Sequence, residues 1–219
     1  MRVLAIDEAG KCPVLGSIWI AGVVIHEEFA ENLFKEGRIN DCKKLSRATI
    51  ENLKQELDAF VDCYYIRRLS PALIDFDCGL NLNDKEMVLV MDIITEALSK
   101  FSDIQKIYVD NFEVSLDKFK ERMKQVGYDY SCYKDFMVVE HQADEKYPPV
   151  MIASIYAKYY RQKEEELFKP LAGSGNPNDK KTIKYIKLVL SGILKDEGWI
   201  RYSWITVQRL KEQINKKNS

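Results

Sequence analysis

Two short apolar runs near the start of the chain, separated by a tight turn, place the strongest constraint on its fold. Residues 2–6 (RVLAI) and 18–25 (IWIAGVVI) are rich in valine and isoleucine, and Gly10 and Pro13 lie between them. Runs of this kind, bounded by glycine and proline, are typical of β-strands. The pattern predicts a sheet whose first strands come early in the chain.

Strands and helices then alternate along the sequence. We predict further strands at 61–68, 105–109 and 136–140, where short apolar runs end in polar residues. Helical spacing and capping residues predict helices at 47–58, from Asn83-Asp84 to about 100, from Ser115 to about 126, at 149–168, at 179–190 and from near Ser203. This order predicts an α/β protein with a mixed sheet flanked by helices. We expect a single domain over residues 1–219, with the helices of about 170–219 forming a C-terminal extension packed on it.

The composition is compatible with an ordinary globular enzyme. The chain has 219 residues, of which 46% are hydrophobic, enough for one large core. It carries 33 basic and 34 acidic residues, so the net charge is −1. This balance argues against a protein that coats nucleic acid nonspecifically. It leaves a nuclease open, because metal-binding acids would offset basic residues elsewhere.

The sequence gives no sign of a membrane or secretory protein. No apolar run is long enough to span a bilayer, and Met1-Arg2 leads directly into a strand pattern. The five cysteines are widely spaced and form no Cys-x-x-Cys pair. We therefore expect a cytoplasmic protein with reduced, mostly buried thiols and no structural zinc.

Acidic residues follow three of the predicted strands. Asp7 and Glu8 end the first run, Asp110 ends the run at 105–109, and Asp144 lies just past 136–140. A single acid at a strand end is usually solvated or part of a turn. Three strand exits with acids indicate instead that the carboxylates meet at one edge of the sheet, where α/β proteins place their sites.

Such a cluster would have a defined chemistry. Carboxylates that lie close together repel one another unless a cation joins them, and oxygen ligands favour Mg²⁺ or Mn²⁺. Two such ions can promote attack on a phosphodiester. Neighbouring strand residues point to opposite faces, so Asp7 and Glu8 would share a site only where the strand ends. We predict that Gly10 and Pro13 provide that end.

Six motifs occur in an order that resembles a known family. They are IDEAGKCPVLG (6–16), DCKKLS (41–46), IYVD (107–110), HQADEKYPPVMIASIYAKYYR (141–161), GSGNPND (173–179) and RYSW (201–204). Together they resemble type-2 ribonuclease H, also called ribonuclease HII, in its compact archaeal form. The resemblance covers residues 2–204.

The resemblance implies a fold, an activity and a metal site. The fold would be ribonuclease H-like, a five-stranded mixed sheet flanked by helices with a C-terminal helical extension. The activity would be endonucleolytic cleavage of RNA paired with DNA, leaving 3′-hydroxyl and 5′-phosphate ends. The four metal-binding acids of the family fall on Asp7, Glu8, Asp110 and Asp144, which would hold two Mg²⁺ or Mn²⁺ ions.

The resemblance also implies partners. These are an RNA/DNA hybrid or duplex DNA that contains ribonucleotides, and we expect a monomer that acts on them away from membranes. Contact with a sliding-clamp protein is left open, because the C-terminal QRLKEQINKKNS has no aromatic pair with which to dock.

Further polar residues resemble family positions near the site or the nucleic acid. They are Lys43, Lys44, Ser46, Ser154, Lys158 and Arg161. The two adjacent lysines offer charge to backbone phosphates. Ser154, Lys158 and Arg161 are spaced by four and three residues and so share one helix face. The alternative is a solvated helix face without function, and the family match favours contact for Lys43, Lys44 and Lys158.

Two departures from the family pattern concern the choice of substrate. The family has Gly-Arg-Gly, whose backbone reads the ribose 2′-hydroxyl, where this chain has Gly10-Lys11-Cys12. Lysine lacks the planar guanidinium, and Cys12 adds a Cβ that changes the close approach. The family also has a tyrosine that stacks on the deoxyribose side of the junction, where this chain has Asn176.

We therefore expect that cleavage of hybrids is retained while incision at a single ribonucleotide is weakened. Two alternatives stay open at this point. One is a metal-dependent DNA nuclease on the same fold, and the other is a catalytically silent protein that binds hybrids. The four intact acids argue against the silent protein, because a pure binder gains nothing from negative charge near phosphates. Thiol catalysis by Cys12 is a remote alternative, since no histidine is close in sequence.

Overall fold

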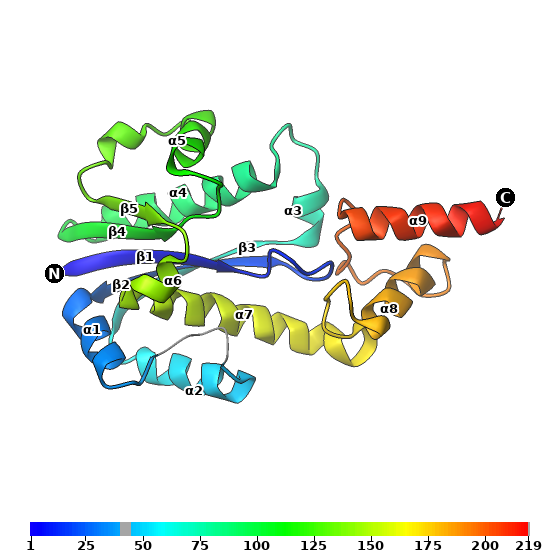
Figure 1. Cartoon of the computed structure of the whole chain (residues 1–219), viewed down its shortest axis with the longest axis horizontal. Helices are drawn as coiled ribbons and strands as arrows, with labels where there is room; N and C mark the ends of the chain where they lie inside the picture. The colour runs from blue at the N-terminus through cyan, green and yellow to red at the C-terminus, as the bar shows by residue number, and fades with distance from the viewer. Residues whose placement is uncertain (40–44, 219) are drawn as a thin grey trace. The chain divides into compact units, whose positions relative to one another are not determined.

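The structure is a computed structural model that describes residues 1–39 and 45–218 (Figure 1). The chain forms two compact units. The first unit contains Met1–Ala9, Trp19–Arg67 and Leu80–Tyr159, and the second contains Gly10–Ile18, Arg68–Gly79 and the chain from Tyr160 onward. The expectation of one domain with an extension from about residue 170 stays a prediction.

A five-stranded sheet forms the centre of the first unit. Its strands are β1 (Arg2–Ala9), β2 (Ile18–His26), β3 (Val61–Leu69), β4 (Ile104–Asp110) and β5 (Met137–Glu140). They lie in the order β3-β2-β1-β4-β5, with β1 antiparallel to β2 and parallel to β4. Strand β4 is parallel to β5. The predicted mixed sheet of five strands is confirmed.

The first strand is longer than its predicted range of 2–6, and it ends directly before Gly10, where the end was predicted. Strand β1 continues through both acids to Ala9, and its register with β2 is unbroken, with Asp7 opposite Ala21 and Glu8 opposite Ile20. Its pairing with β4 stops earlier, at Ile6 opposite Val109. The acids therefore lie in regular strand conformation but beyond the last pair with β4. Asp7 and Glu8 consequently point to opposite faces of the sheet.

Helices cover both faces of this sheet. The helices α1 (Glu27–Lys35) and α2 (Arg47–Leu57), and the part of α7 (Pro148–Ala172) up to Tyr159, lie along one face, and α4 (Leu82–Lys100) and α5 (Leu116–Gln125) lie along the other (Figure 1). Alternate residues of β1 fill the two interfaces. Val3 and Ala5 pack in a core with Ile152 and Tyr156 of α7. A Cβ at Gly22 would lie 2.3 Å from Ile93, so α4 approaches β2 closely at this residue.

The start of α4 differs from the prediction by two residues. The N-cap is Asn81, two residues before the predicted Asn83. The Asn81 side chain accepts from the Asp84 backbone N–H at 3.1 Å, and the Asp84 carboxylate accepts from the Asn81 N–H at 2.8 Å. Both asparagines have an acid three residues later, Asp84 after Asn81 and Glu86 after Asn83, and the structure forms the reciprocal capping box at the earlier one.

The other long helices agree with the predictions. Ser115 caps α5 and Asp179 caps α8 (Lys180–Leu190), as expected. Helix α9 (Ile205–Asn218) begins close to the predicted residue, whereas α7 continues four residues beyond its predicted end. Three short or amphipathic helices were not predicted: α1, α3 (Pro71–Asp75) and α6 (Ala143–Lys146). Within the described residues, none of the helices is both long and apolar enough to cross a membrane.

The second unit has an apolar core of its own. Val14 and Leu15 pack with Phe168 of α7, with Ile186 of α8 and with Val207 of α9. Leu15 also forms an isolated antiparallel bridge with Ile200. The segment 10–18, which looks like a simple turn in the sequence, is thus part of the core of the C-terminal helices.

A buried polar network fixes the end of this segment. Glu164 is buried and accepts from the Ser17 backbone N–H at 2.7 Å and from the Ser17 hydroxyl at 2.5 Å. Arg68 donates to the same carboxylate at 2.8 Å and to the Ser17 hydroxyl at 2.8 Å. Glu164 therefore joins α7 to the segment 10–18 and to Arg68 within the second unit.

We expect Glu164→Ala to destabilise the protein by about 1–3 kcal/mol. The reason is that the buried Ser17 N–H would lose its acceptor, which costs roughly the desolvation energy of that group. Thermal unfolding followed by circular dichroism measures the effect. Glu164→Gln is the matched variant, because its amide oxygen can still accept from Ser17. Its loss in free energy of unfolding should be less than half of the loss in Glu164→Ala. Equal melting temperatures for wild type and Glu164→Ala would contradict this role.

Candidate active site

The structure brings three of the four predicted acids together in the first unit. Asp7 and Glu8 lie in β1, and Asp110 is the last residue of the neighbouring parallel strand β4. Because Ile6 is paired with Val109, the next residue of each strand, Asp7 and Asp110, lie side by side. Asp7, Glu8 and Asp110 line one small cavity between the sheet and α4.

Asp144 approaches through the turn that follows β5. It lies in the first turn of α6, directly after Ala143, whose backbone N–H donates to Asp110 Oδ1 at 2.9 Å. Gln142 precedes this helix with φ 55°, a left-handed conformation that costs energy for any residue except glycine. The strained residue turns the chain sharply from β5 into α6 and thereby brings the start of α6 against Asp110.

The environment of Asp7 is electrostatically unfavourable for its charged form. The pKa of Asp7 is raised well above its ordinary value, first because the carboxyl is buried and second because Asp110 is negatively charged. Glu8 raises the pKa further, while the Glu8 backbone N–H, which donates to Asp7 Oδ1 at 2.7 Å, lowers it. The Ser154 hydroxyl also lowers the pKa, although its position gives no hydrogen bond of normal geometry. A cation at this place would relieve the repulsion.

The donor set fits a hard divalent cation. It consists of carboxylate oxygens from neighbouring strands, as Mg²⁺ and Mn²⁺ prefer. Within residues 1–39 and 45–218, no three acidic, histidine or cysteine side chains are arranged so that they could hold a metal ion. In proteins Mg²⁺ is commonly held by one or two carboxylates together with waters and substrate phosphates.

A fourth acid lines the same cavity and was missed in the sequence. Glu86 of α4 is 1% exposed and lines the cavity with Glu8 and Asp110. Glu8 and Glu86 line this cavity together with Asp7, whose carboxyl also lies beside Ser154 of α7. The signal for Glu86 was its position one residue before Met87 and four before Val90, on the apolar face of the helix.

Helix α7 contributes two of the predicted polar residues to the first unit. Ser154 is fully buried beside Asp7, and Lys158 lies one helical turn later on the same face. The Lys158 Nζ atom is buried and has no hydrogen-bond acceptor among the described residues. Burial of an ammonium group without an acceptor is unfavourable, so this site is suited to receive an anion.

The residues predicted to choose the substrate lie together in the second unit. The Val14 N–H donates to the Gly175 carbonyl at 2.8 Å, which joins the turn of Lys11 and Cys12 to the loop of Asn176. Asn176 and Cys12 are both exposed. Among the described residues other than glycine, only Gln142 has a positive φ, so Cys12 occupies its position without backbone strain.

The remaining predicted contacts have different outcomes. Lys43 and Lys44 lie outside the described residues. Ser46 is the N-cap of α2, where its hydroxyl accepts from the Thr49 N–H at 3.2 Å. Arg161 lies in the second unit and donates to the Leu15 carbonyl at 3.3 Å. The contacts of these residues with nucleic acid stay predictions.

The expectation of mostly buried thiols is wrong for the described cysteines. Cys12, Cys78 and Cys132 are exposed and Cys63 is half-buried, and none of these four forms a disulfide.

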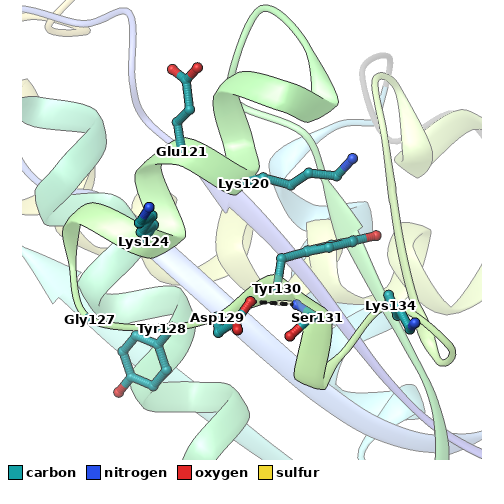
Figure 2. Close-up of a pocket in the computed structure, with 9 residues that line it drawn as sticks. All are labelled: Lys120, Glu121, Lys124, Gly127, Tyr128, Asp129, Tyr130, Ser131 and Lys134. Carbon is teal, nitrogen blue, oxygen red and sulfur yellow. Dashed lines mark hydrogen bonds between the residues drawn. The ribbon is translucent and has the colours of Figure 1, made fainter.

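Another hollow on the first unit contains none of the predicted site residues. It lies between α5 and the turn that follows it, and Figure 2 shows Lys120, Lys124 and Lys134 around Tyr130. The Lys120 ammonium lies 5.3 Å from the centre of the Tyr130 ring. This hollow has two carboxylates, Glu121 and Asp129, among three lysines, whereas four acids line the cavity at Asp7 and Asp110, which is therefore the better candidate for metal chemistry.

The fold and the acids define the class of protein, a nuclease with the ribonuclease H-like fold. The structure resembles the ribonuclease H2 of Pyrococcus horikoshii OT3 with a TM-score of 0.80 and 31% identity, covering 99% of this chain and 100% of that one. It also resembles the ribonuclease HII in the PCNA:RNase HII complex from Archaeoglobus fulgidus, with a TM-score of 0.74 and 30% identity, covering 95% and 96% of the chains. A ribonuclease HIII (Bst-RNase HIII) in complex with Mn²⁺ has a TM-score of 0.80 but 15% identity, which supports the fold alone.

Sequence comparisons agree with this class. A family model for ribonuclease HII matches residues 4–207. The ribonuclease HII of Thermococcus sibiricus is 34% identical over 100% of this chain and 95% of its own length. That of Pyrococcus furiosus is 32% identical with the same coverage. The chain belongs to the ribonuclease HII family and is an enzyme of the ribonuclease H type.

Proposed function

We propose that this enzyme is a metal-dependent endonuclease that hydrolyses the RNA strand of RNA/DNA hybrids and leaves 3′-hydroxyl and 5′-phosphate ends. The observation that carries the proposal is the juxtaposition of Asp7 and Asp110 on neighbouring parallel strands, where burial and mutual repulsion raise the pKa of Asp7. Such a cluster of carboxylates is unfavourable in its charged form unless a cation joins it.

The four acids have distinct positions in this proposal. Asp7, Glu8, Asp110 and Asp144 would hold two Mg²⁺ or Mn²⁺ ions through their carboxylate oxygens. When bound, the ions would supply activation of the attacking water and neutralisation of charge on the scissile phosphate. Ala143 holds Asp110 in place through its N–H, and Ser154 lies beside Asp7. The strained Gln142 keeps α6 in the position from which Asp144 acts.

Lys158 has the role of a phosphate partner in this proposal. Its buried ammonium lies one turn from Ser154 and has no acceptor among the described residues, so a phosphate oxygen would satisfy it. A lysine serves here as a point charge that follows the phosphate as it reacts.

Lys158→Ala is expected to lower kcat/KM for hybrid cleavage by about 10- to 100-fold. A hydrogen bond to a charged group is worth about 1.5–3 kcal/mol, which corresponds to that range. Steady-state cleavage of a labelled hybrid gives the value. Lys163→Ala is the matched control on the same helix, because Lys163 is a surface residue that pairs with Glu166, and it should keep wild-type kcat/KM. A loss no greater for Lys158→Ala than for Lys163→Ala would count against the phosphate contact.

The choice of substrate is the second part of the proposal. The turn of Gly10-Lys11-Cys12 and the loop of Asn176 would contact the ribose and the adjoining deoxyribose. Because both departures from the family pattern fall on this hydrogen-bonded pair of segments, they would affect a single recognition step. We propose that incision of duplex DNA at a single ribonucleotide is weaker than cleavage within a hybrid.

One assay tests both parts. Labelled RNA/DNA hybrid, duplex DNA with one ribonucleotide and all-DNA duplex are incubated with Mg²⁺, with Mn²⁺ and with EDTA. We expect cleavage of the hybrid with either metal and none with EDTA. The single ribonucleotide should be cut less efficiently by about tenfold or more, since loss of one stacking contact costs about 1–3 kcal/mol. Absence of hybrid cleavage would refute the enzymatic proposal, and equally strong cutting at the single ribonucleotide would refute the weakened junction.

The reaction compartment follows from the same chemistry. The four described cysteines are free thiols, three of them exposed, and exposed thiols persist where the surroundings are reducing. We therefore place the enzyme in the cytoplasm as a monomer acting on hybrids or on ribonucleotide-containing DNA.

A further inference from the structure

The guanidinium of Arg201 is buried in the second unit against the backbone of the segment 10–16. Arg201 is 0% exposed. Its Nη2 donates to the Gly10 carbonyl at 2.7 Å, its Nη1 to the Lys11 carbonyl at 3.0 Å and its Nε to the Gly16 carbonyl at 2.7 Å. One side chain thus binds both ends of the segment that contains the turn, although it lies 190 residues after Lys11 in the sequence.

These contacts fix the direction of two peptide groups. In a trans peptide the carbonyl and the following N–H point in opposite directions. Because the carbonyls of Gly10 and Lys11 point to Arg201, the backbone N–H groups of Lys11 and Cys12 point away from it. The turn is also tight, since Gly10 has φ +100° and a Cβ there would lie 2.7 Å from the Ser17 carbonyl.

Neighbouring contacts support the same conformation. Arg161 donates to the Leu15 carbonyl, and the Arg201 backbone N–H donates to the Val14 carbonyl at 3.1 Å. The Trp204 ring lies 4.8 Å from the Arg201 guanidinium and covers it. Only arginine offers a planar group with several donors in fixed directions, so lysine or glutamine could not bind three carbonyls in this way. A buried charge is costly, and the chain uses this one to orient backbone groups.

We propose that Arg201 is a positioning residue for substrate choice. By holding the carbonyls of Gly10 and Lys11, it fixes the direction in which the turn of Lys11 and Cys12 presents its backbone to the ribose. This inference rests on the proposed function, in which that turn contacts the substrate. Arg201 itself touches no reacting atom.

The alternative is that Arg201 only stabilises the second unit. The readout that separates the two is the ratio of kcat/KM for the RNA/DNA hybrid to kcat/KM for duplex DNA with a single ribonucleotide. General loss of stability lowers both values and leaves their ratio unchanged. Displacement of the turn changes the ratio, because the two substrates present different sugars beside the scissile bond.

The experiment compares wild type with Arg201→Lys, Arg201→Gln and Ile186→Ala at a temperature at which each is folded. Ile186 is a buried residue of α8 in the core of the second unit, and it makes none of the polar contacts with the segment 10–16. We expect the ratio to change by about tenfold in both Arg201 variants, with Arg201→Lys closer to wild type because it keeps a charged donor. Ile186→Ala should keep the wild-type ratio although it melts at a lower temperature.

Each outcome decides the inference. A ratio within about twofold of wild type in folded Arg201 variants would overturn it. It would also be overturned if both Arg201 variants failed to fold while Ile186→Ala folded, because Arg201 would then be needed for the whole unit. If wild type cleaved neither substrate, the proposed function would fail first. A changed ratio in the Arg201 variants alone would support the positioning role.

Discussion

Asp110→Asn is expected to reduce kcat for hybrid cleavage by about 10³-fold, equivalent to about 4 kcal/mol of transition-state stabilisation. Asp110 lies beside Asp7 and within the cavity that Glu8 also lines, so its charge is central to the cluster. The protein should remain folded, because asparagine can still accept from the Ala143 N–H through its amide oxygen. Single-turnover cleavage at saturating Mg²⁺ or Mn²⁺ measures the loss.

A matched control lies just before the other end of the same strand. Asp103 precedes β4 and pairs with Arg2 at the surface, so Asp103→Asn should cleave at the wild-type rate. Binding of the hybrid provides a second readout, since removal of a negative charge near phosphates should keep or raise affinity. If Asp110→Asn retained kcat within about tenfold of wild type, the acids would not form the catalytic centre.

Asp7→Asn is expected to raise the melting temperature of the metal-free protein at neutral pH while it abolishes cleavage. The folded state raises the pKa of Asp7 through burial and through the charge of Asp110, so it binds a proton that the unfolded chain has already released. Stability therefore falls as the pH rises from the ordinary value of 3.8 to the pKa in the folded state, and the penalty persists above that pKa. One pKa unit corresponds to about 1.4 kcal/mol, so a gain of several degrees is expected.

The quantity to measure is the difference in melting temperature between wild type and Asp7→Asn at each pH, because other carboxylates titrate in the same range. Melting temperatures in EDTA should be nearly equal near pH 4, and the advantage of Asp7→Asn should grow toward neutral pH and then level off. Adding Mg²⁺ or Mn²⁺ should stabilise wild type more than Asp7→Asn, since the cation offsets the repulsion. A constant difference at all pH values would show that Asp7 is not the titrating group.

Local sequence signals predicted most of the elements but not their ends. The strand patterns and the caps Ser115 and Asp179 depend on neighbouring residues and were predicted correctly. The continuation of β1 through Asp7 and Glu8 was not, because acids are unfavourable in strands and their place there depends on pairing with β2. The residues around Asp7 and Glu8 do not show how far β2 extends beside them, so the length of β1 could not be predicted from them.

Site residues could be predicted only where an acidic residue directly follows an apolar run in the sequence. Asp7 and Asp110 follow apolar runs, and the sheet brings them together as expected. The place of Glu86 on the apolar face of its helix signalled burial, but that it shares a cavity with Glu8 and Asp110 depends on the packing of α4 against the sheet. The link between Arg201 and Gly10 joins distant parts of the chain through backbone carbonyls, which carry no residue-specific signal.

The way in which Arg201 binds the turn has a consequence for how substrate preference could be altered, by selection or by engineering. Its three acceptors are main-chain oxygens, which every residue type supplies. Side chains at positions 11 and 12 can therefore be exchanged without loss of a single anchoring hydrogen bond. The hydrogen bonds that hold the turn do not depend on which side chains stand at positions 11 and 12. New specificities could therefore be screened in a library that randomises Lys11 and Cys12 and keeps Arg201 and Gly10 constant.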